Sequence, residues 1–103
     1  MTIGMIGLGR MGGNMVRRLL RGGHRCVVHD LNPQNVSALA AEGAIGAGSF
    51  EEVVAKLEPP RAVWIMVPAG DATEQTVHAL AQHLQRGDTI IDGGNSYLSL
   101  IHI

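Results

Sequence analysis

The hydrophobic residues of this chain alternate between short continuous runs and longer segments with helical spacing. Short apolar runs are typical of strands in a parallel sheet, and apolar residues three or four positions apart are typical of helices. The predicted strands are 2–7, 25–30, 44–48, 62–67 and 89–92, the third of them weakened by its glycines. The predicted helices are 11–20, 33–42, 49–57 and 71–85.

Capping and turn residues agree with these boundaries. Gly22 and Gly23 follow the first helical segment and can end it. Asn32 and Pro33 are suited to the cap and first turn of the second helix. Ser49, with Glu52 three residues later, forms the pattern of a capping box.

Strictly alternating strands and helices indicate an α/β fold, because parallel strands joined by helices require right-handed crossovers. We predict a Rossmann-like, doubly wound parallel sheet with strand order 3-2-1-4-5. No run remains for a sixth strand, so the sheet is expected to be incomplete at its C-terminal edge.

Composition restricts the class of protein. The 103 residues suffice for one small domain, and 46% of them are hydrophobic. A net charge of −1 and 3% aromatic residues disfavour nucleic-acid binding. No apolar stretch approaches the ~20 residues of a membrane span, and no charged leader precedes the first strand, so a cytoplasmic protein is expected. Cys26, the single cysteine, is expected in the core.

A glycine motif follows the first predicted strand and opens the first helix. It consists of Gly7-Leu8-Gly9-Arg10-Met11-Gly12. In this context Gly7 permits a tight turn, Gly9 lets a pyrophosphate approach the backbone, and Gly12 lets helix and strand pack closely. The N–H groups and positive dipole end of the helix then face the phosphates. The motif predicts dinucleotide binding.

Asp30 ends the second strand, 18 residues after Gly12. A carboxylate at this position can accept hydrogen bonds from the adenosine ribose and would repel a 2′-phosphate, which favours NAD over NADP. Arg10 and Arg25 could still offer charge to a phosphate, so the residues alone leave NADP open as the less favoured cofactor.

Two more loops are expected at the same edge of the sheet, where ligands bind in open α/β folds. The fourth strand ends in Val67-Pro68-Ala69-Gly70, and the fifth in Asp92-Gly93-Gly94-Asn95-Ser96. The five histidines are scattered and predict no metal site. Lys56, the single lysine, is far from this edge, so we find no candidate catalytic residue in the chain.

Four segments together resemble the N-terminal domain of the decarboxylating 6-phosphogluconate dehydrogenases over residues 1–97. The segments are MIGLGRMGGNMVRRLLRGGH, VVHDLNP, VWIMVPAG and IDGGNS. The NADP-dependent branch typically has alanine at the second glycine position and Asn-Arg-Thr after the second strand. This chain has Gly9 and Asp30-Leu31-Asn32, and it therefore resembles the NAD-dependent branch.

The resemblance implies an activity for the longer parent protein. Members of the family oxidise and decarboxylate 6-phosphogluconate to ribulose 5-phosphate, in the pentose phosphate pathway, and the parent is expected to be a homo-oligomer. By resemblance, Val67, Pro68 and Ala69 line the cofactor, and Asn95 lies between cofactor and substrate. The family's lysine base and glutamate acid lie beyond residue 103, so this chain alone is expected to be inactive.

The last six residues, LSLIHI, do not continue the family pattern. They are what CTG TCT CTT ATA CAC ATC encodes, a string that resembles the end of a transposase adaptor for sequencing libraries. We therefore expect a dinucleotide-binding domain at 1–97 and a non-native tail at 98–103, and a bare, self-associating edge at the fifth strand. The alternative is a natural short chain with an apolar tail.

Two other functions remain open at this point. The chain could be a stand-alone module that senses NAD(H), or part of a related 3-hydroxyacid dehydrogenase. The loop after the fifth strand disfavours both: a sensor needs no substrate-facing Asn95, and the 3-hydroxyisobutyrate dehydrogenases usually carry a Ser-Thr pair there.

Overall fold

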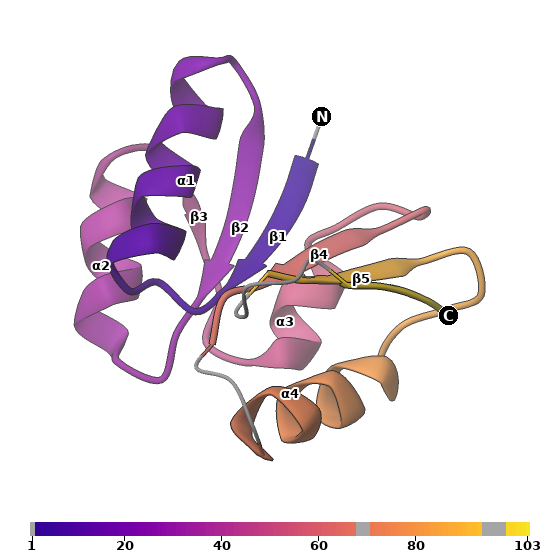
Figure 1. Ribbon diagram of the computed structural model, residues 1–103. Helices are drawn as coiled ribbons and strands as arrows, with labels where there is room; N and C mark the ends of the chain where they lie inside the picture. Colours follow the sequence, from indigo (N-terminus) through magenta and orange to yellow (C-terminus); the bar gives the residue numbers. More distant parts are fainter. Residues whose placement is uncertain (1, 68–70, 94–98) are drawn as a thin grey trace.

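A computed structural model describes residues 2–67, 71–93 and 99–103 of the chain. Strands and helices alternate as far as β5, and a further strand follows (Figure 1). The elements are β1 (Thr2–Ile6), α1 (Arg10–Arg21), β2 (Arg25–His29), α2 (Pro33–Ala41), β3 (Ile45–Gly46), α3 (Phe50–Ala55), β4 (Ala62–Ile65), α4 (Asp71–Ala81), β5 (Thr89–Asp92) and β6 (Ser99–His102).

The strands form one sheet in the order β3-β2-β1-β4-β5-β6. The first five are parallel, which confirms the predicted fold class and the order 3-2-1-4-5. The chain reverses direction across the sheet between β3 and β4, because β4 returns to the other side of β1. The carboxyl ends of β1 and β4 therefore lie side by side at a switch point, where ligands bind in such folds.

Two hydrophobic clusters cover the two faces of the sheet. On one face, Val63 and Ile65 of β4 belong to a cluster with Val53 of α3 and Leu80 of α4. On the other, Met5 and Cys26 contribute to a cluster with residues of α1 and α2. Figure 1 shows these helix pairs on opposite sides of the sheet. Burial on both faces explains why the central strands are continuously apolar.

Cys26 lies in the second cluster with no exposed surface, as expected. Burial raises the pKa of its thiol, so it remains a protonated core residue rather than a nucleophile. None of the helices in the described parts of the chain is long and apolar enough to cross a bilayer.

The predicted helix caps are present. The Asn32 side chain accepts a hydrogen bond from the Gln34 amide, and Pro33 is the first residue of α2. Ser49 Oγ accepts from the Glu52 amide at the start of α3, while Glu52 reaches back to the Gly48 amide. The Gln34 and Glu52 amides are N–H groups that a helix start leaves without an intrahelical partner, whereas the Gly48 amide lies just before the cap of α3.

Helix α4 ends at Ala81, four residues earlier than predicted. The amides of His83 and Leu84 bond to carbonyls three residues back, which tightens the chain into a turn. The Gln85 amide then donates to the buried carboxylate of Asp88. Leu84 is still buried, so the apolar spacing that predicted a longer helix also fits a helix followed by a tight turn.

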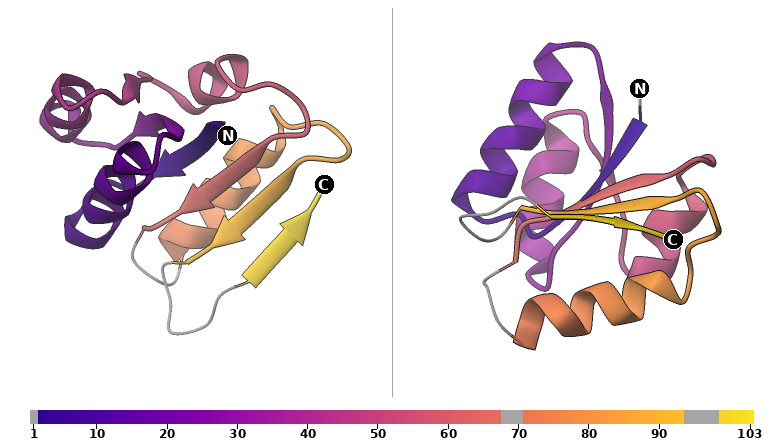
Figure 2. Two further views of the ribbon diagram at one scale, coloured as in Figure 1. Left: turned by 90° about the horizontal axis from the view of Figure 1, so that it is seen from above. Right: turned by 45° about the vertical axis from the view of Figure 1, so that its right-hand side comes forward.

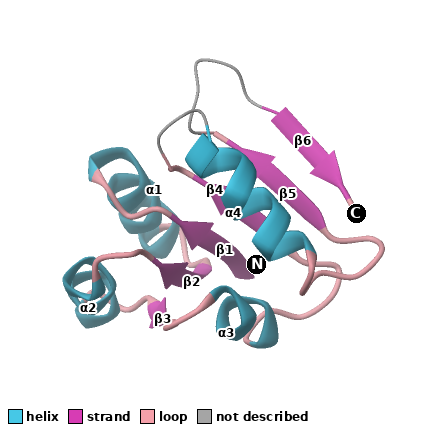
Figure 3. Ribbon diagram, turned by 90° about the horizontal axis from the view of Figure 1, so that it is seen from below, coloured by secondary structure: helices cyan, strands magenta, loops and turns pink. Residues whose placement is uncertain are grey.

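The prediction of a bare edge at β5 is wrong. Residues 99–102, expected to lie outside the fold, form β6, which pairs antiparallel with β5 (Figures 2 and 3). Ile101 and Ile103 pack against the first hydrophobic cluster, whereas Leu100 before them is 58% exposed and His102 between them is also exposed. Exposed and half-buried residues alternate over 100–103 in the way an edge strand requires, and β5 offers unpaired backbone groups to this strand.

Candidate functional site

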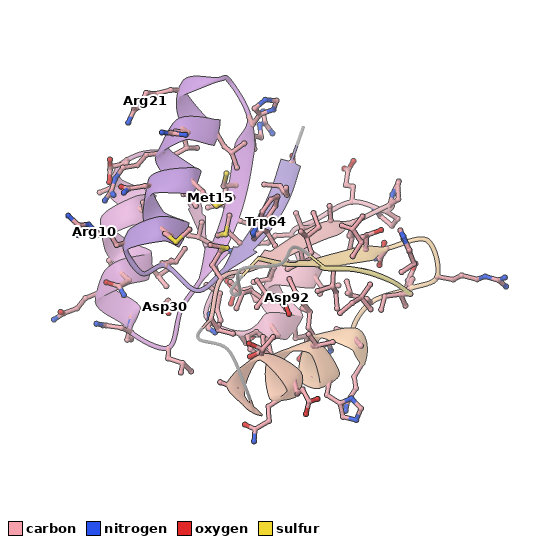
Figure 4. The ribbon with its side chains drawn as sticks, in the orientation of Figure 1. Arg10, Met15, Arg21, Asp30, Trp64 and Asp92 are labelled. Carbon is pink, nitrogen blue, oxygen red and sulfur yellow. The ribbon has the colours of Figure 1, made fainter. Side chains whose placement is uncertain are left out.

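A cleft of about 800 Å³ lies at the carboxyl ends of β1, β2, β4 and β5. Its volume is within the range of roughly 300–1,000 Å³ that is typical of small-molecule sites. The residues lining it are Ile6, Gly7, Gly9, Arg10, Met11, Gly12, His29, Asp30, Leu31, Asn35, Phe50, Met66, Val67, Ala72, Thr76 and Gly93. Figure 4 shows Arg10 at the start of α1 and Asp30 just past the end of β2, with Asp92 on the other side of β1.

At two positions in the turn between β1 and α1, only glycine fits. Gly7 has φ 95°, a left-handed conformation that disfavours other residues, and a Cβ there would lie 2.7 Å from the Met66 carbonyl. A Cβ on Gly12 would overlap the carbonyl oxygen of Gly7. These contacts give Gly7 and Gly12 the turn and packing roles that the motif predicts.

Gly9 is different, because nothing in the chain itself requires glycine there. Its φ is −66° and its ψ is −167°, a conformation open to any residue. Among the described residues, no atom lies within 4 Å of the position that a Cβ on Gly9 would take. The open space lies beside the first turn of α1, where N–H groups without intrahelical partners can bind an anion. This arrangement fits a pyrophosphate that approaches the backbone closely.

Polar and aromatic groups lie at the end of β2. Asp30 Oδ2 accepts a hydrogen bond of 2.5 Å from Asn35 Nδ2 on α2. His29 Nδ1 bonds to the carbonyl oxygen of Ala47 at 2.9 Å, and because that oxygen can only accept, the proton is on Nδ1. The ring of Phe50 lies edge-on to the His29 ring, with centroids 5.3 Å apart. This side of the cleft therefore combines a carboxylate with two fixed rings.

Met66 and Trp64 support the opposite side of the cleft. The Trp64 indole N–H donates to Met66 Sδ at 2.9 Å. A Cβ on Gly93 would collide with the Trp64 Nε1 and lie 2.9 Å from that sulfur. Residue 93 therefore has to be glycine for the end of β5 to lie this close to the side chains of Trp64 and Met66.

The structure brings most of the predicted site residues together. Those lining the cleft are Gly7, Gly9, Arg10, Met11, Gly12, Asp30 and Val67. The side chain of Leu8 does not line it, because this residue is 5% exposed and packs in the second hydrophobic cluster. Pro68, Ala69 and Asn95 lie outside the described residues.

Sequence reasoning missed several residues that line the cleft, among them His29, Asn35, Phe50, Met66 and Thr76. His29 could have been predicted because it is adjacent to Asp30. Asn35 could have been predicted from its position in the first turn of the second helix. Phe50 and Thr76 come from helices whose packing only the folded chain reveals. The described residues include no group of three or more His, Cys, Asp or Glu side chains that could hold a metal ion.

The doubly wound sheet and the glycine turn at its switch point define a dinucleotide-binding domain of the Rossmann type. Residues 2–101 match the family model described as the NAD binding domain of 6-phosphogluconate dehydrogenase. The chain belongs to this family of NAD-binding domains.

Curated relatives agree with this family. The chain is 45% identical over 97 residues to the NAD(+)-dependent, decarboxylating 6-phosphogluconate dehydrogenase of Haloferax volcanii, covering 94% of this chain and 32% of that protein. It is 46% identical over 99 residues to the decarboxylating 6-phosphogluconate dehydrogenase of Haemophilus influenzae, covering 91% and 20% respectively. The chain thus spans a third or less of the length of these relatives.

Among solved structures, the 6-phosphogluconate dehydrogenase of Plasmodium falciparum is similar, with a TM-score of 0.85 and 28% identity. The match covers 94% of this chain and 22% of that one. That enzyme is described with its cofactor NADP+, whereas the Haloferax relative is NAD(+)-dependent. The relatives therefore include users of both cofactors.

Proposed function

We propose that this chain is the cofactor-binding part of an NAD-linked 6-phosphogluconate dehydrogenase that converts 6-phosphogluconate to ribulose 5-phosphate. The observation that carries the proposal is the open space at Gly9, in a turn where Gly7 and Gly12 are glycines for steric reasons and Gly9 is not. The relatives support the reaction, since both curated proteins are named as decarboxylating 6-phosphogluconate dehydrogenases.

In this proposal each group of the cleft has a physical task. The first-turn amides of α1 bind the pyrophosphate, and Gly9 leaves room for it. Asp30 accepts hydrogen bonds from the adenosine ribose. By resemblance, Val67, Pro68 and Ala69 line the cofactor, and Asn95 lies between cofactor and substrate. When bound, the nicotinamide supplies the hydride acceptor.

We expect NAD+ to bind at least about tenfold more tightly than NADP+, because a 2′-phosphate beside Asp30 would be repelled and desolvated without a matching cation. Asp30→Ala should bring the two affinities closer together, by weakening NAD+ and relieving the repulsion of NADP+. Calorimetric titration of both cofactors into both forms of the chain measures this.

Glu58→Ala is the matched control for this titration. Glu58 is an exposed acid in the loop before β4, at the amino end of that strand and therefore away from the cleft. Its loss changes the net charge by the same amount as the loss of Asp30. Equal affinity of the unaltered chain for both cofactors, or tighter NADP+ binding, would contradict the proposed preference. If Glu58→Ala changed the selectivity between NAD+ and NADP+ as much as Asp30→Ala does, the effect of Asp30→Ala would be due to net charge alone.

The chain by itself is expected not to oxidise 6-phosphogluconate. A general base contributes about 10²–10⁴-fold to such a step, and we identify no base in this chain. The family's lysine and glutamate come from segments beyond residue 103. Purified chain incubated with NAD+ and 6-phosphogluconate should form NADH no faster than a blank, and steady NADH formation would show that a base within the chain had been overlooked.

The proposal extends to the parent protein and to its boundaries. We propose a longer, homo-oligomeric, cytoplasmic enzyme in which residues 1–97 are native and residues 98–103 are a non-native tail, because LSLIHI is what an adaptor-like string would encode. Reading the genomic DNA past codon 97 tests the boundary. A frame that continues into a helical domain with a lysine base would support it, and LSLIHI followed by a natural stop codon would contradict it.

A further inference from the structure

Asn35 touches the residue on which the proposed cofactor preference depends. It is the third residue of α2, and its Nδ2 donates a hydrogen bond of 2.5 Å to Asp30 Oδ2. Both residues are half-buried, and both line the cleft. The direction of the bond follows from chemistry, because a carboxylate can only accept and the amide nitrogen must therefore face it.

The backbone of α2 holds Asn35 in this position. A helical Cα–Cβ bond tilts toward the N-terminus, so a side chain in the first turn points back over the incoming chain, where Asp30 lies. Asn32 caps the helix through the Gln34 amide, and its carbonyl accepts from the Asn35 amide. Pro33 restricts the first helical residue further. The donor is thus presented from a well-defined helix start.

The bond orients the carboxylate before any ligand arrives. An Asp side chain that is free to rotate would lose that freedom on binding, and one already held by Asn35 loses less. Oδ2 is engaged by the amide, while no hydrogen bond from the other described residues occupies Oδ1, which can therefore accept from a ribose hydroxyl. The amide is also neutral. A lysine or arginine in its place would hold Asp30 equally well but would offer a 2′-phosphate a cationic partner.

We infer that Asn35 is a positioning residue that holds the Asp30 carboxylate toward the adenosine ribose and, by doing so without positive charge, contributes to the preference for a free 2′-hydroxyl. The inference rests on the proposed function, because it assumes that Asp30 binds the ribose. It adds a residue of α2, outside both the glycine motif and the end of β2 where Asp30 lies.

The test compares two ligands that differ only in the ribose hydroxyls, ADP and 2′,3′-dideoxy-ADP. They are titrated calorimetrically into the 103-residue chain and its variants. Asn35→Ala should weaken ADP binding by about 3–10-fold, the range expected for losing one preorganised side chain. It should leave dideoxy-ADP binding unchanged, because that ligand has no hydroxyl for Asp30 to bind. In an Asp30→Ala background, Asn35→Ala should have no further effect on ADP.

Two more variants sharpen the test. Gln34→Ala, an exposed amide one residue earlier on the same helix, should alter neither ligand. Asn35→Lys should keep Asp30 paired but improve the binding of 2′-phospho-ADP relative to ADP, because it adds the cation that Asn35 withholds.

The outcomes separate the inference from the proposed function. If the unaltered chain prefers ADP to dideoxy-ADP and Asn35→Ala keeps that preference in full, the inference is wrong and the ribose role of Asp30 stands. If Asn35→Ala weakens both ligands equally, Asn35 shapes the cleft without positioning Asp30, and the inference is again wrong. If the unaltered chain does not distinguish the ligands, or binds neither, the proposed role of Asp30 and the inference fail together.

Discussion

Replacing Gly12 by alanine is expected to lower the free energy of unfolding by at least about 2 kcal/mol, as for other overpacked sites, and to abolish measurable NAD+ binding. A Cβ on Gly12 would overlap the carbonyl oxygen of Gly7 and lie 3.4 Å from the Met66 Cβ. The atom in the way is backbone, so the whole β1–α1 turn must shift. That shift moves the first turn of α1, whose amides are the proposed phosphate site. Urea unfolding and calorimetric titration measure the two effects.

The neighbouring glycine provides a matched control. A Cβ on Gly13 would lie 3.6 Å from the Arg17 guanidinium and 3.7 Å from the Leu8 carbonyl, which are ordinary contacts. Since alanine is favoured over glycine in a helix by about 0.8–1.0 kcal/mol, Gly13→Ala should be neutral or stabilising. If the two alanine variants had equal stability, the close approach at Gly12 would not be what requires glycine there.

Gly9→Val separates binding from folding within the same turn. The conformation of Gly9 is accessible to valine, and no atom of the residues that the structure describes lies within 4 Å of its Cβ position. The variant should therefore unfold like the unaltered chain but lose NAD+ binding, because the branched side chain occupies the space proposed for the pyrophosphate. Retained NAD+ affinity in a folded Gly9→Val chain would contradict the proposed phosphate position.

Replacing Asp88 by alanine is expected to lower the free energy of unfolding by about 3–5 kcal/mol, the usual cost of removing one partner from a buried ion pair. Asp88 is 1% exposed, and its carboxylate accepts from the amides of Arg61 and Gln85 at 2.7 and 2.8 Å. The Arg61 guanidinium pairs with it at 3.3 Å. Alanine would leave these partly buried donors without their acceptor. Since domains of this size have total stabilities of about 5–15 kcal/mol, this loss is a large fraction of the total.

The same carboxylate predicts a dependence of stability on pH. Burial raises the pKa of Asp88, but hydrogen bonds from the Arg61 and Gln85 amides and the Arg61 charge outweigh it, so the pKa lies below its ordinary value of 3.8. The carboxylate therefore contributes its full stability above the ordinary pKa. This contribution is lost as the pH falls below 3.8 toward the lowered pKa of the folded chain.

Urea unfolding of the unaltered chain and Asp88→Ala between pH 2 and pH 7 measures both effects. The difference in stability between the two should be largest near neutral pH and should shrink in acid. Glu58→Ala, which removes an exposed acid, should change stability by less than about 0.5 kcal/mol. A difference between the unaltered chain and Asp88→Ala that did not vary with pH would show that the ionised carboxylate is not what stabilises this region.

The order of elements could be predicted because each depends on local patterns. Apolar runs located the five parallel strands to within two residues at either end, although β3 is shorter than predicted. Asn32 and Ser49 marked helix starts through bonds to amides two and three residues away. The end of α4 was predicted too late, because the chain there is turned by Asp88, a buried partner that follows the helix in sequence.

The edge strand β6 could not be predicted from its own residues. Apolar and polar residues alternate in LSLIHI only in part, since Leu100 and Ile101 are adjacent, and whether the segment pairs depends on the unpaired side of β5, which exists only once the sheet has formed. Asn35 escaped prediction for a related reason. Its polarity and its place in a first turn are ordinary, and only the packing of α2 beside the end of β2 brings it against Asp30.

The amino-acid sequence by itself determined the alternation of strands and helices, the strand order through the handedness of crossovers, and the glycine turn with an acid after the second strand. These features depend on periodicity, chirality and backbone sterics, which act within a few residues or one crossover. The tertiary structure alone decided which side chains share the cleft, that Leu8 turns away into the core, and that Asp88 is buried against Arg61. Those outcomes depend on contacts between residues far apart in the chain, whose distances are set only when the helices pack on both faces of the sheet.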